Sequence, residues 1–295
     1  MTLPSHLCFR NCRALVSLLP LLLLIGACSA PVSRPTGVAY DYDAAKDMFK
    51  RGRFERVLEF TDDLFKASPP NAFTERARVL RVAVLSGEVK GYTELADAYR
   101  KGADTTKDAR FKAEFERLRH DHLQYGSTRA LALGEVAHTY TEIKSLPKEV
   151  VLDAPYPTAE GPLTVPQLSR VMEGGWIEPP EQEAATRGAQ LKGIEGALAE
   201  MVGGDRAKAR TVLTAGPVKM DGVDYVLYLG KSLLEGTLLF DRKHMDDPAK
   251  AEPLCTEASK LADLALAILK ESPNKDKENA VKQLQDDVKR TLKNI

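Results

Sequence analysis

The sequence predicts an all-α fold built from antiparallel helix pairs, and three observations lead to this class. Apolar residues recur at spacings of three and four through most of the chain after residue 40. Glycines and prolines separate these apolar stretches, as they do where one helix ends and the next begins. The strict alternation that marks a half-buried strand is nearly absent, and Val150-Val151-Leu152 is the one short candidate.

The first 27 residues have the pattern of a targeting segment. Arg10 and Arg13 precede an apolar run, Ala14 to Ala27, that is shorter than the roughly 20 residues of a spanning helix. The run ends in Ile25-Gly26-Ala27-Cys28, which resembles the lipobox of bacterial lipoproteins: an aliphatic residue, two small residues and a cysteine. The resemblance implies cleavage between Ala27 and Cys28 and lipid attachment at Cys28. The alternative is an ordinary signal peptide cleaved after Ala30.

The resemblance also predicts where the chain resides. Residues 28–38 contain Ser, Pro and Gly without an apolar period, so we expect a flexible, lipidated tether. Ser29 follows the lipobox cysteine, and in lipoproteins of this kind a residue other than Asp there usually permits transfer to the outer membrane. We therefore expect a body held by its lipid at the periplasmic face of the outer membrane.

Charge and cysteine content exclude several classes of partner and site. Lys and Arg number 42, Asp and Glu also 42, so no basic excess points to nucleic acid or anionic lipid. Cys8 and Cys12 lie in the signal, and Cys28 is the predicted lipid site. Only Cys255 remains, so the body is expected to have no internal disulfide. Cys255 lies in a helical pattern and is expected to be buried; the alternative is an exposed, reactive thiol.

Residues 40 to 68 predict a helix, a short turn and a second helix. Gly52, Phe54, Val57, Leu64 and Pro69 have the spacing of a tetratricopeptide repeat, which this stretch resembles. Val57 and Leu64 are bulkier than the alanines that the repeat usually has. The resemblance implies a solenoid of stacked antiparallel helix pairs, in which the glycine permits the turn and the proline closes the unit.

Two further helix pairs are predicted before residue 146. The first joins Phe73–Leu85 to Val89–Lys101 through a turn at Gly87, which follows Gly52 by about one repeat length of 34 residues. The second joins Asp108–Tyr125 to Ser127–Lys144. We therefore assign residues 39–146 to N-terminal helical repeats.

Residues 147–166 interrupt the helical pattern. Five prolines lie in this stretch: Pro147, Pro155, Pro157, Pro162 and Pro166. The segment is either a linker between two domains or a long loop folded back along the helices, and loops of this length are often functional.

Residues 167–295 are expected to form C-terminal helical repeats. Gly204 and Ala209 again match repeat positions, in a turn and the helix that follows it. Two long apolar helices are expected over Val223–Phe240 and Pro248–Ser272. The last helix, Lys275–Leu292, has a narrow apolar stripe and a charged back, which is typical of a capping helix.

The sequence offers few candidates for chemistry. His120 and His122 are two residues apart in a helix, so they point about 200° from each other and cannot share one metal ion. His122 is expected to pack in the apolar stripe. The acidic loop around Asp241 and Asp247 lacks the spacing of a calcium loop and is expected to be solvated and to cap the next helix. Trp176 is a candidate partner contact if exposed, and burial is the alternative.

Short catalytic motifs are missing from the sequence. There is no G-x-S-x-G, no H-E-x-x-H and no complete phosphate loop. We therefore predict no catalytic residue, no metal and no cofactor. The leading hypothesis is an adaptor or scaffold that binds an envelope protein or peptide in a groove between helices. The alternative is a small-ligand-binding accessory component of solute uptake, and a third hypothesis is a purely structural lipoprotein. An open groove lined by apolar residues favours the first, and a polar internal cavity the second.

Overall fold

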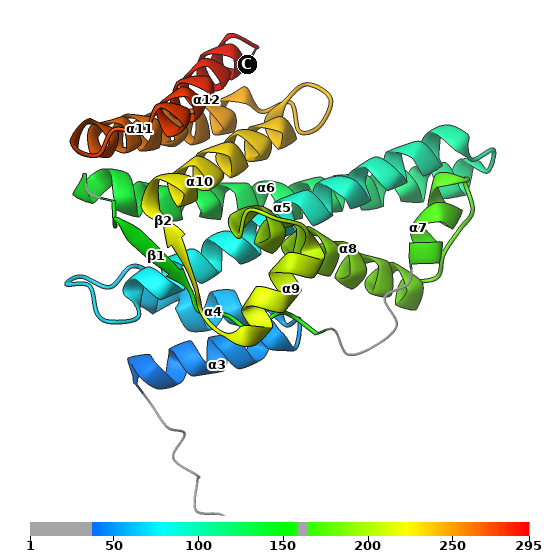
Figure 1. Cartoon of the computed structure of the whole chain (residues 1–295). Helices are drawn as coiled ribbons and strands as arrows, with labels where there is room; N and C mark the ends of the chain where they lie inside the picture. Colours follow the sequence, from blue (N-terminus) through cyan, green and yellow to red (C-terminus); the bar gives the residue numbers. More distant parts are fainter. Residues whose placement is uncertain (1–36, 145, 159–164, 295) are drawn as a thin grey trace, which may run out of the picture. The chain divides into compact units, whose positions relative to one another are not determined.

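A computed structural model describes residues 37–144, 146–158 and 165–294 of the chain (Figure 1). These residues are mostly helical, which confirms the all-α class. The predicted signal, the lipobox and Cys28 lie outside the described residues. In chain order the elements are α3 (Val38–Lys50), α4 (Phe54–Phe65), α5 (Thr74–Thr105), α6 (Ala109–Ile143), β1 (Glu149–Leu152), α7 (Val165–Met172), α8 (Pro179–Met201), α9 (Arg206–Ala215), β2 (Val218–Asp221), α10 (Gly222–Thr237), the 3-10 turn η2 (Leu238–Phe240), α11 (Pro248–Glu271) and α12 (Lys275–Asn294).

The helix pair predicted between residues 40 and 68 is formed by α3 and α4. Gly52 has a φ of 70° at the turn, a backbone conformation that residues with a Cβ rarely adopt. Phe54 packs edge-to-face on an aromatic ring of α3 at 5.8 Å between centroids. Val57 and Leu64 are buried in the same interior. Four of the five repeat positions thus form this pair, whereas Pro69 is exposed beyond the end of α4.

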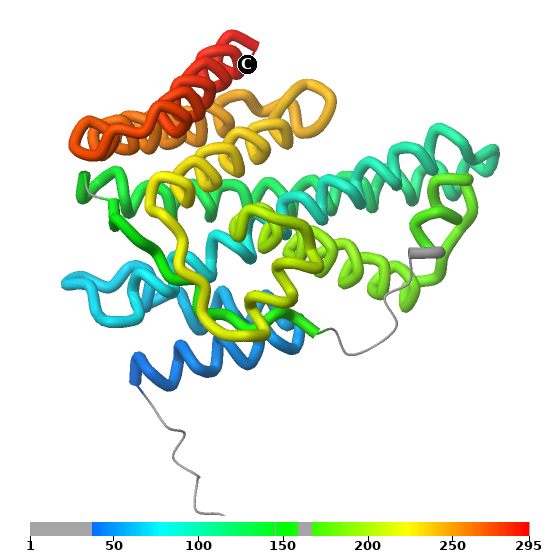
Figure 2. The backbone as a smooth tube through the Cα atoms, in the orientation of Figure 1, coloured from blue at the N-terminus to red at the C-terminus, as the bar shows by residue number. Residues whose placement is uncertain are grey.

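The two helix pairs predicted next are wrong, because each is one continuous helix. α5 runs for 32 residues through Gly87, and α6 for 35 residues through the break expected between Tyr125 and Ser127. Figure 2 shows the chain following both helices without interruption. A glycine inside a helix costs only about 1 kcal/mol relative to alanine. Here each glycine permits close packing instead of a turn: a Cβ on Gly126 would lie 3.2 Å from Leu239.

A close helix crossing in this region joins α5 to α8. A Cβ on Gly193 would collide with the backbone carbonyl of Gly87, and a Cβ on Gly91 would lie 2.6 Å from the carbonyl oxygen of Ala189. Backbones can approach this closely only where side chains are absent. The crossing joins a helix that precedes residues 147–166 to one that follows them, so helices from both parts of the chain share one interior.

The described part of the proline-rich segment, residues 147–158, contains the strand candidate. β1 pairs antiparallel with β2, with Glu149 opposite Asp221 and Leu152 opposite Val218. Beyond the strand, Asp153 accepts a hydrogen bond from Lys46 at 2.7 Å. The pairing strand β2 is absent from the sequence-based prediction because its four residues, Val-Lys-Met-Asp, are too few to show a pattern.

The C-terminal helices follow the predicted ranges closely. α10 with η2, α11 and α12 occupy the segments expected to be two apolar helices and a capping helix. Cys255 is fully buried, as expected for a small hydrophobe. Of the four residues predicted to form the apolar stripe of α12, Val281, Leu284 and Val288 are buried, whereas Leu292 is exposed.

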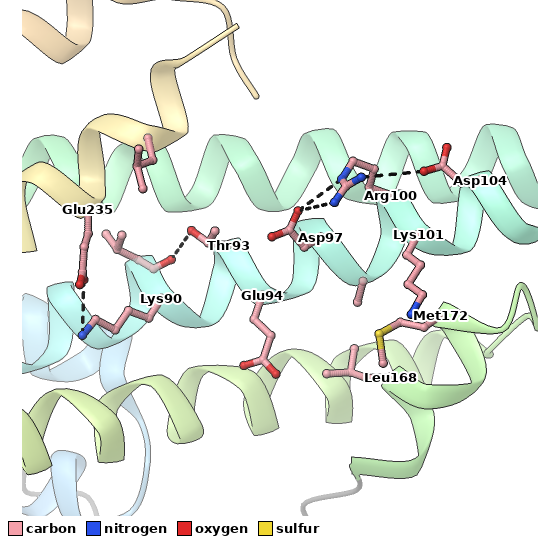
Figure 3. A pocket seen from close by; sticks show the side chains of 13 residues that line it. Lys90, Thr93, Glu94, Asp97, Arg100, Lys101, Asp104, Leu168, Met172 and Glu235 are labelled. Atoms are coloured by element: carbon pink, nitrogen blue, oxygen red, sulfur yellow. Dashed lines mark hydrogen bonds and ion pairs between the residues drawn. The ribbon is translucent and has the colours of Figure 1, made fainter. Parts of the chain in front are cut away.

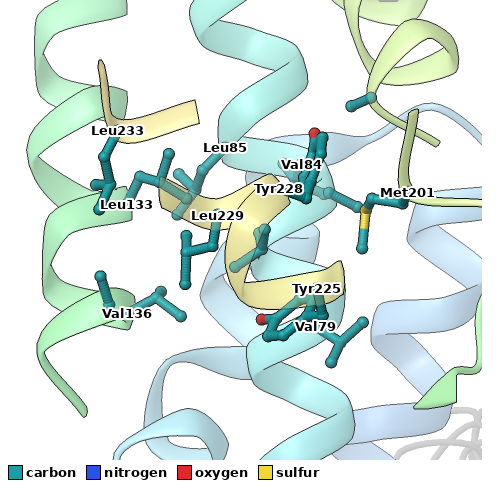
Figure 4. Close-up of a cluster of buried hydrophobic side chains, with 14 of the residues drawn as sticks. Val79, Val84, Leu85, Leu133, Val136, Met201, Tyr225, Tyr228, Leu229 and Leu233 are labelled. Atoms are coloured by element: carbon teal, nitrogen blue, oxygen red, sulfur yellow. The ribbon is translucent and has the colours of Figure 1, made fainter. Parts of the chain in front are cut away.

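The main core lies where α5, α6 and α10 meet (Figure 4). Tyr225, Leu229 and Leu233 of α10 pack among Leu85 of α5 and Leu133 of α6. Each fully buried leucine contributes about 1.5–3 kcal/mol relative to exposure in water. These three helices form the frame along which the two grooves described below lie.

Candidate functional site

An open groove of about 740 Å³ runs along the C-terminal half of α5, between α7 and the junction of α10 with η2 (Figure 3). We call it the α5 groove. Its apolar surface comes from three elements: Val89 and Ala98 of α5, Leu168 and Met172 of α7, and Leu238 of η2. Leu238 is 54% exposed. The groove therefore presents apolar side chains to whatever enters it.

Most charged side chains that line the α5 groove are in ion pairs, and Lys101 is the exception among the described residues. Lys90 lies 3.4 Å from Glu235 and 2.6 Å from Glu200 of α8. Arg100 lies 3.3 Å from Asp97 and also pairs with a second aspartate on the same helix (Figure 3). Exposed pairs of this kind contribute up to about 1 kcal/mol each. Lys101 aside, these charges are compensated, so we regard the apolar surface as the main recognition feature of the groove.

A second groove, of about 770 Å³, lies between the α4–α5 loop, α6 and α11. We call it the α6 groove. Phe65, Leu131 and Leu254 line its apolar part, one from each of α4, α6 and α11. Ile143, near the end of α6, also lines it and is 54% exposed. Unlike the α5 groove, it contains a buried basic side chain.

That basic side chain is Arg78, which lines the α6 groove although only 7% of it is exposed. Its Nε donates to the backbone carbonyl of Phe65 at 3.1 Å, and its guanidinium lies over the ring of Tyr140 at 5.3 Å. Glu75 lies 3.6 Å from Nη1, beyond hydrogen-bond distance. Burial raises the pKa of Glu75, against the hydrogen bond from Tyr140 and the charge of Arg78. The guanidinium is thus held by the Phe65 carbonyl, the Tyr140 ring and an ion pair between Nη1 and Glu75.

Glu257 of α11 forms the opposite wall of the α6 groove. Its side chain accepts hydrogen bonds from Lys260 at 2.8 Å, from His138 at 3.3 Å and from Thr141. Burial acts to raise the pKa of Glu257, but these three donors together hold that pKa below its usual value. This carboxylate is therefore ionised and satisfied within the protein.

A seam of buried charge connects α4, α5 and α6. We call it the charged seam; its members are Arg78, Arg81, Glu88 and Arg129. Arg81 donates to the carbonyl of Leu58 at 2.7 Å, and burial lowers its pKa to about 10. Buried charges are tolerated only where partners replace the lost water.

Glu88 is the most buried member of the charged seam, with no exposed surface. Arg129 approaches one carboxylate oxygen to 2.6 Å with its Nε, and also pairs with Glu55 of α4. Gln190 of α8 donates to the other oxygen at 2.9 Å. Burial is the largest influence and raises the pKa of Glu88 to about 7, although Arg129 opposes it. Glu88 therefore joins three helices through a single carboxyl group.

The C-terminal half of α5 packs in a different kind of interior, an aromatic cluster of Tyr92, Tyr99, Phe115, His122 and Trp176. His122 stacks on Tyr99 at 5.4 Å with an angle of 13° between the planes. Burial lowers the pKa of His122 to about 4, so the ring is neutral near pH 7. The expectation that His122 packs in the apolar stripe is confirmed, and His120 is exposed.

Trp176 is half-buried rather than freely exposed. Its ring stacks on Phe111 at 5.4 Å with an angle of 15° between the planes, and contacts Phe115 at 5.9 Å. It lines neither of the two grooves. The ring is therefore partly buried, and its role as a partner contact stays a prediction.

The remaining predicted positions are distributed over turns and helix interiors. Ala209 is fully buried in α9, and Gly204 lies in the preceding turn, where Gly203 has the positive φ. Asp241 accepts hydrogen bonds from the backbone amide and the ring of His244. Asp247 precedes α11 without a capping hydrogen bond from its side chain, so the predicted cap is wrong.

The members of the charged seam are missing from the sequence-based site prediction. Arg78, Arg81 and Glu88 belong to the most apolar part of α5, where Val79, Leu80 and Val82 to Leu85 are also buried. The sequence does show charged residues at spacings of three and seven within this apolar run, and that pattern could have indicated buried charge. This spacing can be interpreted only after the apolar run has been assigned to one continuous, buried helix.

Three findings bear on the class of protein. No group of three His, Cys, Asp or Glu side chains in the described part of the chain is close enough to hold a metal ion. Within residues 37–144, 146–158 and 165–294, no helix combines the length and apolarity that a bilayer span requires. Comparison with protein-family models, curated proteins and solved structures gave no match.

Proposed function

We propose that this chain is a lipid-anchored adaptor of the bacterial cell envelope, and that it binds an amphipathic helix of a partner protein in the α5 groove. The α5 groove itself is the observation that carries the proposal. It is open to solvent, its apolar side chains come from three elements, and Leu238 is half exposed. Apolar surface gathered in an open groove is typical of a protein-interaction site.

The dimensions of the groove favour a helix as its occupant. Its lining residues on α5 extend from Val89 to Asp104. At 1.5 Å per residue this is about 22 Å, or four turns of a docked helix. The paired charges around it would lie beside the polar flanks of such a helix, while Leu168, Met172 and Leu238 contact its apolar face. Binding of this kind requires no catalytic group, metal or cofactor.

The anchor and the fold assignment belong to the same proposal. Cleavage before Cys28 and acylation of Cys28 would hold the adaptor at the periplasmic face of the outer membrane, where its partner would also reside. The body would be a degenerate tetratricopeptide-like protein. The α3–α4 pair, with Gly52 at its turn, supports this assignment most directly.

Site-specific photo-crosslinking in cells tests the proposal. A photoreactive amino acid replaces Leu238 in the groove of the full chain, and Tyr40 of α3 in a control that is 39% exposed outside it. We expect one discrete protein adduct from position 238 and none from position 40. The adduct should disappear in Leu168→Glu, which places a charge on the groove surface, and persist in Ser169→Glu, an exposed neighbour on the same helix.

The membrane anchor is tested in the same experiment with Cys28→Ala. If the partner is held at the membrane, the unanchored chain should give at least tenfold less adduct at position 238. Equal adducts at positions 238 and 40, or no adduct at 238, would overturn the helix-binding function. An adduct of unchanged yield in Cys28→Ala would overturn the anchored arrangement alone.

A further inference from the structure

We propose that the α6 groove binds the free C-terminal carboxylate of a polypeptide whose last residue is apolar. The inference does not rest on the α5 groove, which lies on other elements. It joins three features of the α6 groove: a fixed guanidinium, an apolar surface beside it, and two acidic side chains along α6.

Arg78 supplies the carboxylate-binding group. Its Nε is engaged by the Phe65 carbonyl and its plane by Tyr140, so the guanidinium is held without rotational freedom. Arg78 lines the groove although only 7% of it is exposed, and its Nη1 lies 3.6 Å from Glu75. A planar, preorganised guanidinium binds a carboxylate through two parallel hydrogen bonds. Little conformational entropy is lost when it binds, because the side chain is already fixed.

The apolar surface beside Arg78 accommodates the last side chain of the peptide. Phe65 carries the carbonyl that binds Arg78, and its buried ring forms the floor of the groove there, beneath the Arg81 guanidinium. Leu131 and Leu254 complete this surface from α6 and α11. A polypeptide whose last residue is apolar has a carboxylate directly beside an apolar side chain, which matches this arrangement.

Two glutamates predict which residues precede the terminus. Glu135 and Glu142 line the groove, are exposed, and form no ion pair within the part of the chain that the structure describes. They favour a basic side chain upstream of the apolar last residue. The groove extends along α6 from Leu131 to Ile143, which is about 18 Å and matches about five extended residues. A single free amino acid would leave most of this length empty.

A peptide library provides the probe. Random hexapeptides are synthesised as two sets, one with free C-terminal carboxylates and one with C-terminal carboxamides, and binding to the purified soluble body is measured by fluorescence anisotropy. We expect free-acid peptides that end in Leu, Ile, Val, Met or Phe to bind at least tenfold more tightly than their carboxamide twins. Lys or Arg should be enriched upstream.

Two buried arginines on the same helix give a matched pair of variants. Arg78→Lys keeps the charge but removes the planar fork, and should weaken free-acid peptides to the affinity of the carboxamides. Arg81→Lys alters an arginine that is buried to the same degree and likewise bound to a carbonyl of α4, but lies outside the groove lining. Because Arg81 stacks on the Phe65 ring at 4.0 Å, this change should affect free-acid and carboxamide peptides by the same factor. Circular dichroism reports whether both variants remain folded.

A second pair keeps the test decisive if Arg78→Lys fails to fold. Ile143→Asp places a negative charge on the exposed wall of the groove and should weaken free-acid peptides about tenfold. Leu292→Asp, on exposed surface of α12, should leave their affinity unchanged. The proposal is overturned if no library peptide binds, or if free-acid and carboxamide peptides bind equally. It is also overturned if Arg78→Lys has the same effect as Arg81→Lys, or Ile143→Asp the same effect as Leu292→Asp. None of these results alters crosslinking at Leu238, so the two proposals fail separately.

Discussion

The two halves of α5 bury polar groups by opposite means. The N-terminal half passes through the charged seam, where Arg81, Glu88 and Arg129 lie beside charged or polar partners on α4, α6 and α8. The C-terminal half enters the aromatic cluster, where His122 has no hydrogen bond to its Nδ1 in the described structure and stacks on Tyr99. In the first half charge is paired; in the second it is avoided.

The difference has a consequence for pH dependence. The raised pKa of Glu88, about 7, means that the folded chain keeps a proton which the unfolded chain releases near its ordinary value of 4.5. Stability from this group falls as pH rises through that window. The pKa of His122 is lowered to about 4. Below pH 6.5 the unfolded chain therefore binds a proton at this histidine that the folded chain does not bind. Stability from this group falls as pH falls, so the two halves oppose each other.

The largest expected effect comes from a substitution that disturbs the packing of both halves of α5. Gly193→Ala adds a Cβ that collides with the Gly87 carbonyl at the α5–α8 crossing, between the two regions. Because backbone atoms cannot rotate away, the helices must separate, and we expect a loss of more than about 3 kcal/mol in the free energy of unfolding. Urea denaturation measures it. Gly196→Ala on the same helix has only Arg206 within 4.0 Å and should be neutral or stabilising; equal losses would contradict the crossing.

The next effect breaks only the charged seam. Arg129→Met removes the guanidinium that approaches Glu88 and leaves a buried carboxylate without its cation. We expect a loss of about 3 kcal/mol at pH 8, because an uncompensated buried charge is costly. The loss should shrink at pH 5, where Glu88 is protonated. The double variant Arg129→Met with Glu88→Gln should recover most of the stability at pH 8, and a loss independent of pH and of Glu88 would point to packing alone.

A third effect isolates the aromatic cluster. His122→Phe keeps an aromatic ring beside Tyr92 and Tyr99 and removes the group whose pKa is lowered. The wild-type chain should lose about 2–3 kcal/mol through this group between pH 6.5 and 4, and the variant should not. Chemical denaturation across that range measures the difference. His120→Gln, which alters an exposed neighbour, should keep the wild-type slope.

The same contrast explains what sequence reasoning could predict. Repeated spacings of three and four identify α10 to α12, and His122 falls on a stripe whose burial follows from its spacing. Gly87 and Gly126 mislead, because a glycine that permits a turn and a glycine that permits a close crossing look alike in one dimension. Only the partner helix distinguishes them, and Gly193 of α8 lies far along the chain from Gly87.

The grooves are beyond sequence reasoning for a related reason. The α6 groove takes residues from α4, α6 and α11, so no local window contains it. Arg78 is visible in the sequence as a charge inside an apolar run, but its fixed geometry depends on the Phe65 carbonyl and the Tyr140 ring. The burial of a charge can be suspected from the sequence, whereas its direction requires the fold.

The smallest expected effect sharpens the comparison between buried and exposed charge. Arg100 lies on α5 as Arg81 does, yet its pairs with Asp97 and Asp104 are about half exposed, and solvent screens them. Arg100→Gln should therefore change the free energy of unfolding by less than about 0.5 kcal/mol, with little dependence on pH. Urea denaturation beside Arg129→Met gives the contrast directly. If Arg100→Gln lost as much stability as Arg129→Met, burial of the charge would not be the reason why the pair in the charged seam is costly to break.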